Sequence, residues 1–112
     1  MVELPNKARV VISDSKVSNY LLSETHAIGK SKARFFRSFG FNEANIEQFK
    51  QALSDLAQNE SVTDTLESLY GVKYVIDGQL KTPNGITIHV RTVWIIEVGD
   101  DTPRLVTAHP LD

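Results

Sequence analysis

A segment of twelve residues, THAIGKSKARFF at positions 25–36, gathers a histidine, a glycine and three basic side chains without a carboxylate. The longer segment 25–42 also lacks Asp and Glu, although the protein has a formal net charge of −2. A run of charge is usually a solvated helix face. This run follows an imidazole, which titrates near neutral pH, so the segment is also a candidate for proton transfer beside a phosphate.

Metal-free cleavage of RNA is a reaction that such residues can perform. It needs a base for the ribose 2′-OH, an acid for the leaving 5′-oxygen and a cation for the charge on the phosphorane. His26 could be the base or the acid. Lys30, Lys32 and Arg91 could hold the phosphate, and an arginine can do so with two parallel hydrogen bonds. Thr107 could donate a hydrogen bond to a phosphate oxygen.

These residues also have ordinary structural interpretations. A single histidine after Ser-Glu-Thr is more often a loop or cap residue, and Lys32 and Arg34 are most simply solvent-facing helix residues. Arg91 lies in a predicted strand, where it could be the cross-strand ion-pair partner of Asp77 or Glu97. On spacing alone, the catalytic interpretation is a weak signal.

A zinc site is the remaining chemical alternative. The only histidines are His26, His89 and His109, and no two of them have the short spacing that zinc ligands commonly show. The chain has no Cys, which excludes thiolate ligands and disulfides. We therefore expect neither a metal nor another cofactor.

Helices are expected to position the basic segment. Ser13 or Asp14 can cap a short helix, and Ser31 can cap a second helix, 32–39, that Gly40 ends. Asn42 can cap the clearest helix, about 43–58. Its apolar stripe has three- and four-residue spacing and consists of Ile46, Phe49, Ala52, Leu53 and Leu56.

The second half of the chain has a period of two, which is typical of strands. Strands are predicted at 72–81, 86–98 and 104–109, with a Thr-Pro-Asn-Gly turn between the first two. Segment 61–71 is ambiguous and is predicted to be a loop with a short helical turn. Short turns between consecutive strands require antiparallel pairing. We expect one α+β domain, 1–112, with N-terminal helices packed on a C-terminal antiparallel meander of three to four strands.

Alternation in the long strand assigns its side chains to two faces. If Trp94 faces the helices, then His89 and Arg91 share the available face. Thr107 and His109 share a face of the last strand. We therefore expect the basic segment to form one pocket with Arg91 and Thr107 on the sheet.

Composition restricts the location and the partners. The N-terminus, MVELPNKARVVIS, carries charges before a short apolar run and is not a signal peptide. No apolar run approaches the roughly 18 residues of a membrane span, so a soluble cytoplasmic protein is expected. The mildly acidic charge disfavours a general nucleic-acid coat, but it permits a local site for a small RNA.

Four ordered motifs carry a family resemblance. They are THAIGKSKARFFRSFGFN (25–42), LYGVKYVIDGQL (69–80), TPNGITIHVRTVWII (82–96) and PRLVTAHP (103–110). The chain resembles a small bacterial domain of unknown function. It is similar to toxin domains at the C-terminal tips of filamentous-haemagglutinin-like contact-dependent inhibition proteins and other polymorphic toxins. More remotely, it resembles the barnase–EndoU–colicin–RelE group of metal-independent ribonucleases, which build their site on an antiparallel sheet and an adjoining helix.

The resemblance implies a ribonuclease toxin that leaves 2′,3′-cyclic phosphate ends on RNA, with tRNA as one candidate substrate. It implies neutralisation by a small acidic immunity or antitoxin protein. The residues that the resemblance supports are His26, Gly29, Lys30, Lys32, Arg91, Thr92 and Thr107. We expect His26, Lys30, Arg91 and Thr107 to be catalytic, and we expect Gly29, Lys32, Arg34, Thr92 and His109 to bind RNA.

Two departures from the pattern leave an alternative open. His109 stands where similar sequences have an aromatic residue such as tyrosine, so it could supply a second acid or base, or the site could be altered. The chain begins with its own Met and carries no delivery domain, so we expect a stand-alone version. The alternative is a non-catalytic interaction domain, or a relic, that has kept the fold.

Overall fold

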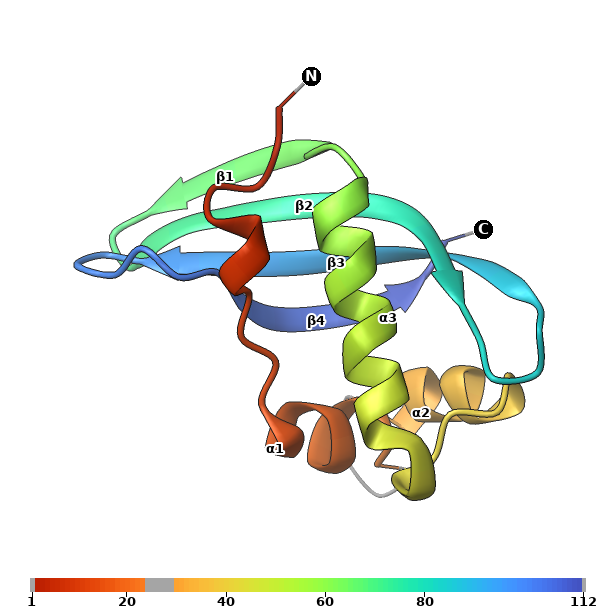
Figure 1. The fold of residues 1–112 in the computed structure, drawn as a ribbon. Coiled ribbons are helices and arrows are strands. Elements are labelled where there is room, and N and C mark those ends of the chain that lie inside the picture. Colours follow the sequence, from red (N-terminus) through yellow and green to blue (C-terminus); the bar gives the residue numbers. More distant parts are fainter. Residues whose placement is uncertain (1, 24–29, 112) are drawn as a thin grey trace.

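The computed structural model describes residues 2–23 and 30–111 and places helices before a sheet (Figure 1). The helical elements are η1 (Lys7–Arg9), α1 (Asp14–Lys16), η2 (Val17–Leu21), α2 (Lys30–Ser38), η3 (Glu43–Asn45) and α3 (Ile46–Asn59). The strands are β1 (Asp64–Ser68), β2 (Gly71–Lys81), β3 (Thr87–Glu97) and β4 (Arg104–Pro110). All neighbours are antiparallel in the order β1-β2-β3-β4, which confirms the α+β meander with four strands.

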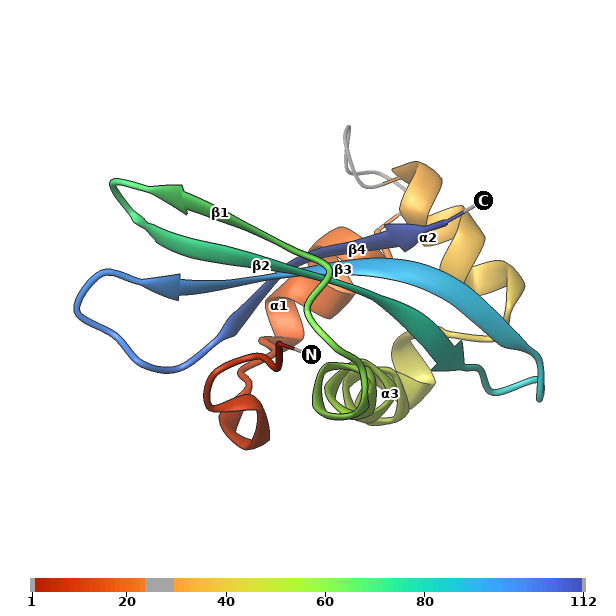
Figure 2. The same ribbon diagram turned by 90° about the horizontal axis from the view of Figure 1, so that it is seen from above.

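The helices cover one face of the sheet and one of its edges. Helix α3 crosses the strands on one side, whereas α2 lies beside β4 and toward the other side (Figure 2). No helix in the described part of the chain lies across this second face, called the open face below. Within the same residues, no helix combines the length and apolar character that crossing a membrane would require.

Local caps define some of the helix ends. The Ser13 side chain accepts a hydrogen bond from the Lys16 amide, and the Asn42 side chain accepts one from the Ala44 amide, which confirms both as N-caps. Gly40 follows α2 with a φ of 101°, a conformation that glycine adopts without steric cost. The prediction that Ser31 caps α2 is wrong, because the helix already begins at Lys30.

The prediction of a loop with a short helical turn at 61–71 is wrong for residues 64–68, which form strand β1. Its five residues pair with β2 in an unbroken register from Asp64–Val75 to Ser68–Gly71. Long-range pairing therefore decides the structure of a segment whose sequence shows no clear period.

The core joins the helices to the sheet through aromatic side chains. Phe36, Phe41, Phe49 and Trp94 are fully buried, as predicted. The rings of Phe41 and Phe49 stack with centroids 4.2 Å apart, and those of Phe36 and Phe49 lie 4.9 Å apart. The other predicted core aromatics are only half-buried against this cluster: Phe35, Phe39 and Tyr74.

Truncation of Phe49 tests this packing. We expect Phe49→Ala to lower the free energy of unfolding by about 3–5 kcal/mol, because it removes a ring from the centre of the cluster. Urea denaturation measures the loss. Tyr70→Ala is the matched control, because Tyr70 is 78% exposed, and it should change stability by only about 0.5 kcal/mol. A loss below about 1 kcal/mol for Phe49→Ala would contradict the observed packing of α3.

Candidate functional site

The strand register aligns polar side chains across the open face. Asp77 of β2 pairs with Arg91 of β3, and Arg91 pairs with His109 of β4. Two register positions further along, Val93 pairs with Thr107. Because neighbours along a strand alternate between faces, Thr107 and His109 lie on the same face as Arg91. The buried side chains of β3 point to the other face, beneath α3.

Lys32 links α2 to this face. Its Nζ donates hydrogen bonds to the hydroxyl of Tyr20, at 2.6 Å, and to Oγ1 of Thr107, at 3.1 Å. Tyr20 Oη and Thr107 Oγ1 are themselves 3.4 Å apart. The three residues come from α2, η2 and β4, and they form a partly buried polar cluster at the β4 edge. A basic residue of the acid-free segment thus reaches the sheet, as expected.

The cluster changes the acidity of Tyr20. Partial burial would raise the pKa of its phenol, but hydrogen bonds from Lys32 and Thr107 favour the phenolate. The charges of Lys32 and Lys16 act in the same direction, and both Nζ atoms lie about 5 Å from the centre of the tyrosine ring. The net result is a pKa below the ordinary value of tyrosine. Tyr20 is therefore a candidate proton-transfer group.

Arg91 forms a cross-strand ion pair with Asp77, which is one of the two partners that its structural interpretation allows. Its Nε and Nη2 donate to the two carboxylate oxygens at 2.8 and 2.9 Å. The hydrogen bonds from Arg91 hold the pKa of Asp77 below its usual value, although partial burial opposes this effect. Glu97, the other possible partner, binds Arg104. Arginine has five N–H donors, so those on Nη1 lie outside this ion pair, and the side chain is 41% exposed.

His109 is a second possible proton-transfer group. The imidazole is half-buried, and its Nδ1 lies 3.2 Å from the carbonyl oxygen of Pro110. A carbonyl only accepts, so this contact favours the tautomer with hydrogen on Nδ1 and leaves Nε2 as the basic nitrogen. His89 is exposed on the same face, as expected from the alternation of β3.

Thr92 requires a correction. It is fully buried, its hydroxyl donates to the Ile76 carbonyl at 2.9 Å, and it accepts from Trp94 Nε1 at 2.8 Å. Thr92 is therefore a core residue on the face opposite Arg91 and cannot contact RNA in this fold. Resemblance alone had placed it among the RNA-binding residues.

The remaining predicted residues lie around the start of α2. Arg34 is exposed on that helix, which favours its interpretation as a solvent-facing residue. His26 and Gly29 lie outside the described residues, and for Lys30 only the backbone, at the start of α2, is described. The structure brings Lys32 into contact with Thr107, which shares its face with Arg91. The expected common pocket stays a prediction.

Tyr20 is the residue that the sequence prediction missed. Its spacing from Val17 and Leu21 suggested only an apolar helix face. The sequence does place Lys16 four residues before Tyr20, a separation at which helical side chains meet. Its contact with Lys32 and Thr107 depends on long-range packing, for which the sequence carries no local signal.

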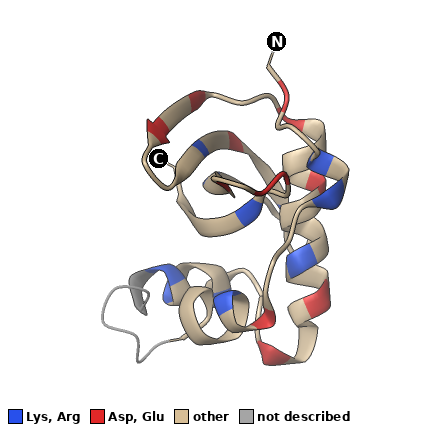
Figure 3. Cartoon of the chain, turned by 90° about the vertical axis from the view of Figure 1, so that its left-hand side faces the viewer, with Lys and Arg blue, Asp and Glu red and all other residues tan. Residues whose placement is uncertain are grey.

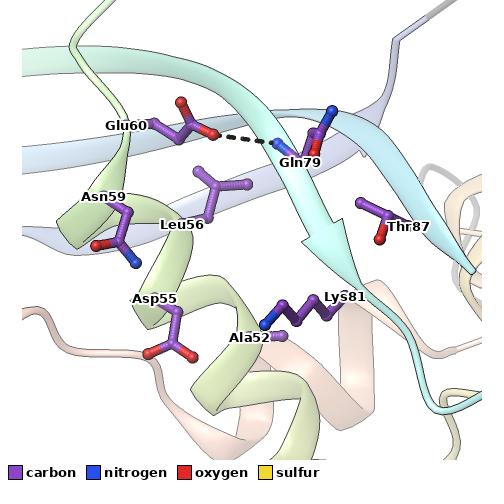
Figure 4. Close-up of a pocket in the computed structure, with 8 residues that line it drawn as sticks. All are labelled: Ala52, Asp55, Leu56, Asn59, Glu60, Gln79, Lys81 and Thr87. Carbon is purple, nitrogen blue, oxygen red and sulfur yellow. Dashed lines mark hydrogen bonds between the residues drawn. The ribbon is translucent and has the colours of Figure 1, made fainter. Parts of the chain in front are cut away.

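A separate cleft lies away from these residues. It has a volume of about 270 Å³ and lies between α3 and the ends of β2 and β3 (Figure 4). Its walls are Ala52, Asp55, Leu56, Asn59, Glu60, Gln79, Lys81 and Thr87. None of the predicted site residues lines this cleft. Among the described residues, no three His, Cys, Asp or Glu side chains are placed to hold a metal ion. The zinc hypothesis also involves His26, which lies outside the described residues.

The acidity of Tyr20 can be measured directly. We expect the ultraviolet absorbance of tyrosinate to appear below pH about 10 in the wild type, because Lys32 stabilises the phenolate. Tyr20→Phe should remove this early phase, and Lys32→Met should move it to higher pH. Lys73→Met, which removes a lysine from β2, should leave it unchanged. An early phase that survives Tyr20→Phe would belong to another of the three tyrosines.

The Asp77–Arg91 pair predicts a pH dependence of stability. The folded-state pKa of Asp77 is lowered, so its stabilisation is complete above the unfolded-state pKa of about 3.9 and is lost as pH falls through the folded value. In urea melts over this range, wild type should lose more stability than Asp77→Asn. Asp55→Asn, which neutralises a carboxylate that has no ion pair among the described residues, should retain the wild-type slope. Equal slopes for all three proteins would contradict the pair.

Comparisons with known proteins agree with this fold. A chain of the contact-dependent growth inhibition toxin–immunity protein complex from Klebsiella pneumoniae 342 has a similar structure, with a TM-score of 0.66 and 18% sequence identity. The match covers 95% of this chain and 97% of that chain, and at this identity it shows the fold alone. No curated protein matches the chain in sequence. A family model matches residues 3–112, and the chain therefore belongs to the family described as "Domain of unknown function (DUF6883)".

Proposed function

We propose that the chain is a toxin-like domain that cleaves RNA without a metal ion and leaves 2′,3′-cyclic phosphate ends. One observation carries the proposal: Lys32, Tyr20 and Thr107 meet at the edge of the open face, beside strand positions of Arg91 and His109. Such a face offers cations, a hydroxyl donor and titratable groups to one phosphate. The similarity to the toxin–immunity complex supports a toxin-like fold.

The proposed reaction uses these groups in two proton transfers. The ribose 2′-oxygen attacks phosphorus while a base removes its proton, and the P–O5′ bond breaks as an acid protonates the leaving oxygen. His26 remains the proposed proton-transfer residue. We propose that Tyr20 and the Nε2 atom of His109 share this work.

Electrostatic stabilisation is assigned to the basic residues. Lys32 already points its ammonium group at two hydroxyl groups, and a phosphate oxygen could replace either of them as its partner. Arg91 would bind through its remaining donors, and Lys30 would add a charge at the start of α2. Gly29 and Arg34 are proposed to contact RNA outside the reacting phosphate.

The proposed substrate is RNA, with tRNA as one possibility, and the proposed location is the cytoplasm. The proposed inhibitor is a small acidic protein that covers the open face. The similar solved structure is a complex of a toxin with an immunity protein, which supports a protein partner for this chain as well.

A non-catalytic interaction domain is the second candidate, and the Asp77–Arg91 pair favours it. Asp77 already neutralises the arginine that would bind phosphate, and its own negative charge repels an approaching phosphate. In this interpretation the open face is a protein-binding surface of the same fold.

Incubation of the purified protein, freed of any partner, with total tRNA and single-stranded RNAs separates the candidates. We expect cleavage in EDTA, cyclic phosphate ends and no cleavage of DNA, which lacks the 2′-OH nucleophile. His26→Ala should reduce the rate by about 10²–10⁴-fold without unfolding the protein. Lys32→Met and Tyr20→Phe should also slow cleavage.

Lys73→Met is the matched control and should retain full activity, because Lys73 lies on β2 at the far end of the sheet. Full activity in His26→Ala would remove that residue from the mechanism. Absence of cleavage on every RNA tested would favour the interaction domain instead.

A further inference from the structure

The two edges of the sheet differ in how far they are protected from pairing with a further strand. The β4 edge is partly covered by the N-terminal segment, where Val11 forms a parallel bridge with Arg104. Val11 donates to the Pro103 carbonyl at 2.8 Å, and Leu105 donates back to the Val11 carbonyl at 3.0 Å. At the opposite edge, β1 pairs with β2, and no described strand pairs with its outer side.

The β1 edge lacks most devices that prevent a foreign strand from adding. Its sequence, DTLES, has no proline and no lysine, and its register contains no bulge. Every residue of β1 is exposed. The outer side of the strand therefore offers backbone donors and acceptors to another extended chain, although the Thr65 amide already donates to Oδ1 of Asp64 at 2.8 Å.

Apolar side chains surround the end of this edge. Leu69 is 93% exposed, and Leu66, Tyr70 and Val98 are also mostly exposed. The Val98 amide donates to the Tyr70 carbonyl at 2.9 Å, so the two hairpin ends lie side by side. This end of the sheet extends beyond the helices (Figure 2). A shallow groove beside it is lined by Leu66, Tyr70 and Ile95, among others. Clustered exposed leucine and tyrosine side chains are typical of a protein-binding surface.

Charge distinguishes among possible occupants. β1 carries Asp64 and Glu67 and no basic residue, whereas basic residues gather on α2 (Figure 3). Neither of these two acids has an ion pair among the described residues. A second copy paired through β1 would bring the acids of both chains into one ladder, where like charges repel. A strand with basic residues would instead meet complementary charge.

We propose that β1 and the adjoining hairpin ends bind a partner protein that adds one strand carrying apolar and basic residues. Backbone hydrogen bonds along β1 would supply affinity, and side chains would set the register. An apolar residue of the partner packs beside Leu66 on the open face, and a Lys or Arg residue approaches Glu67 on the opposite face. This surface lies on the opposite edge of the sheet from Lys32 and Thr107, so it is separate from the candidate ribonuclease site.

A synthetic seven-residue peptide of alternating lysine and valine, capped at both ends, is the probe. We expect saturable binding at sub-millimolar concentration, with amide chemical-shift changes along β1 and its hairpin. Glu67→Lys should weaken binding of this peptide about tenfold, which corresponds to about 1.4 kcal/mol, and should allow a glutamate–valine peptide to bind. Glu47→Lys makes the same charge change on α3 and should leave binding unchanged. Because Glu67 is exposed, both variants should keep the wild-type fold.

A lysine–valine peptide with proline at its centre tests the backbone contribution, because proline lacks the N–H donor. It should bind more weakly than the parent peptide, and equal binding would overturn strand addition. The proposal also fails if the parent peptide does not bind at millimolar concentration, if Glu67→Lys has no effect, or if the shift changes cluster around Lys32. Sedimentation that shows a dimer disrupted by Leu66→Lys would assign the surface to a second copy instead.

Discussion

The arrangement of the open face depends on the burial of β3 beneath the helices. One side of this strand faces the core with the side chains of Ile88, Val90 and Trp94. These apolar side chains can be buried together in only one register of the strand. A shift by one residue would place Arg91 in the core and Trp94 in solvent. The hydrophobic effect therefore fixes the position of the charged residues, although these contribute little to the core themselves.

Thr92 and Trp94 show how the core accommodates polar atoms at this position. The threonine hydroxyl donates to one strand and accepts from the indole, so both buried groups are satisfied. Valine would fit in shape but would leave the indole N–H without this acceptor. The family resemblance implies that Thr92 binds RNA. The need of the Trp94 indole for a buried hydrogen-bond acceptor explains instead why a threonine is present at this position.

Much of this organisation could be predicted from the sequence. The period of two placed Arg91 opposite the helix-facing residues, and the caps at Ser13 and Asn42 follow from side-chain chemistry that acts over a few residues. What could not be predicted depends on distant partners. Strand β1 exists because β2 is beside it, and Tyr20 belongs to the site because α2 brings Lys32 to the same edge of the sheet. Of the two partners considered for Arg91, only the folded register selects Asp77.

The bridge between Val11 and Arg104 joins segments from near the two ends of the sequence. Contacts of such long separation close large loops and form late relative to local helices. During synthesis, the N-terminal segment must therefore wait until the last strand has been made before it can cover that strand. Until then, both edges of the growing sheet are open to other chains. The order of synthesis thus makes this small domain most vulnerable to aggregation just before its last strand is complete.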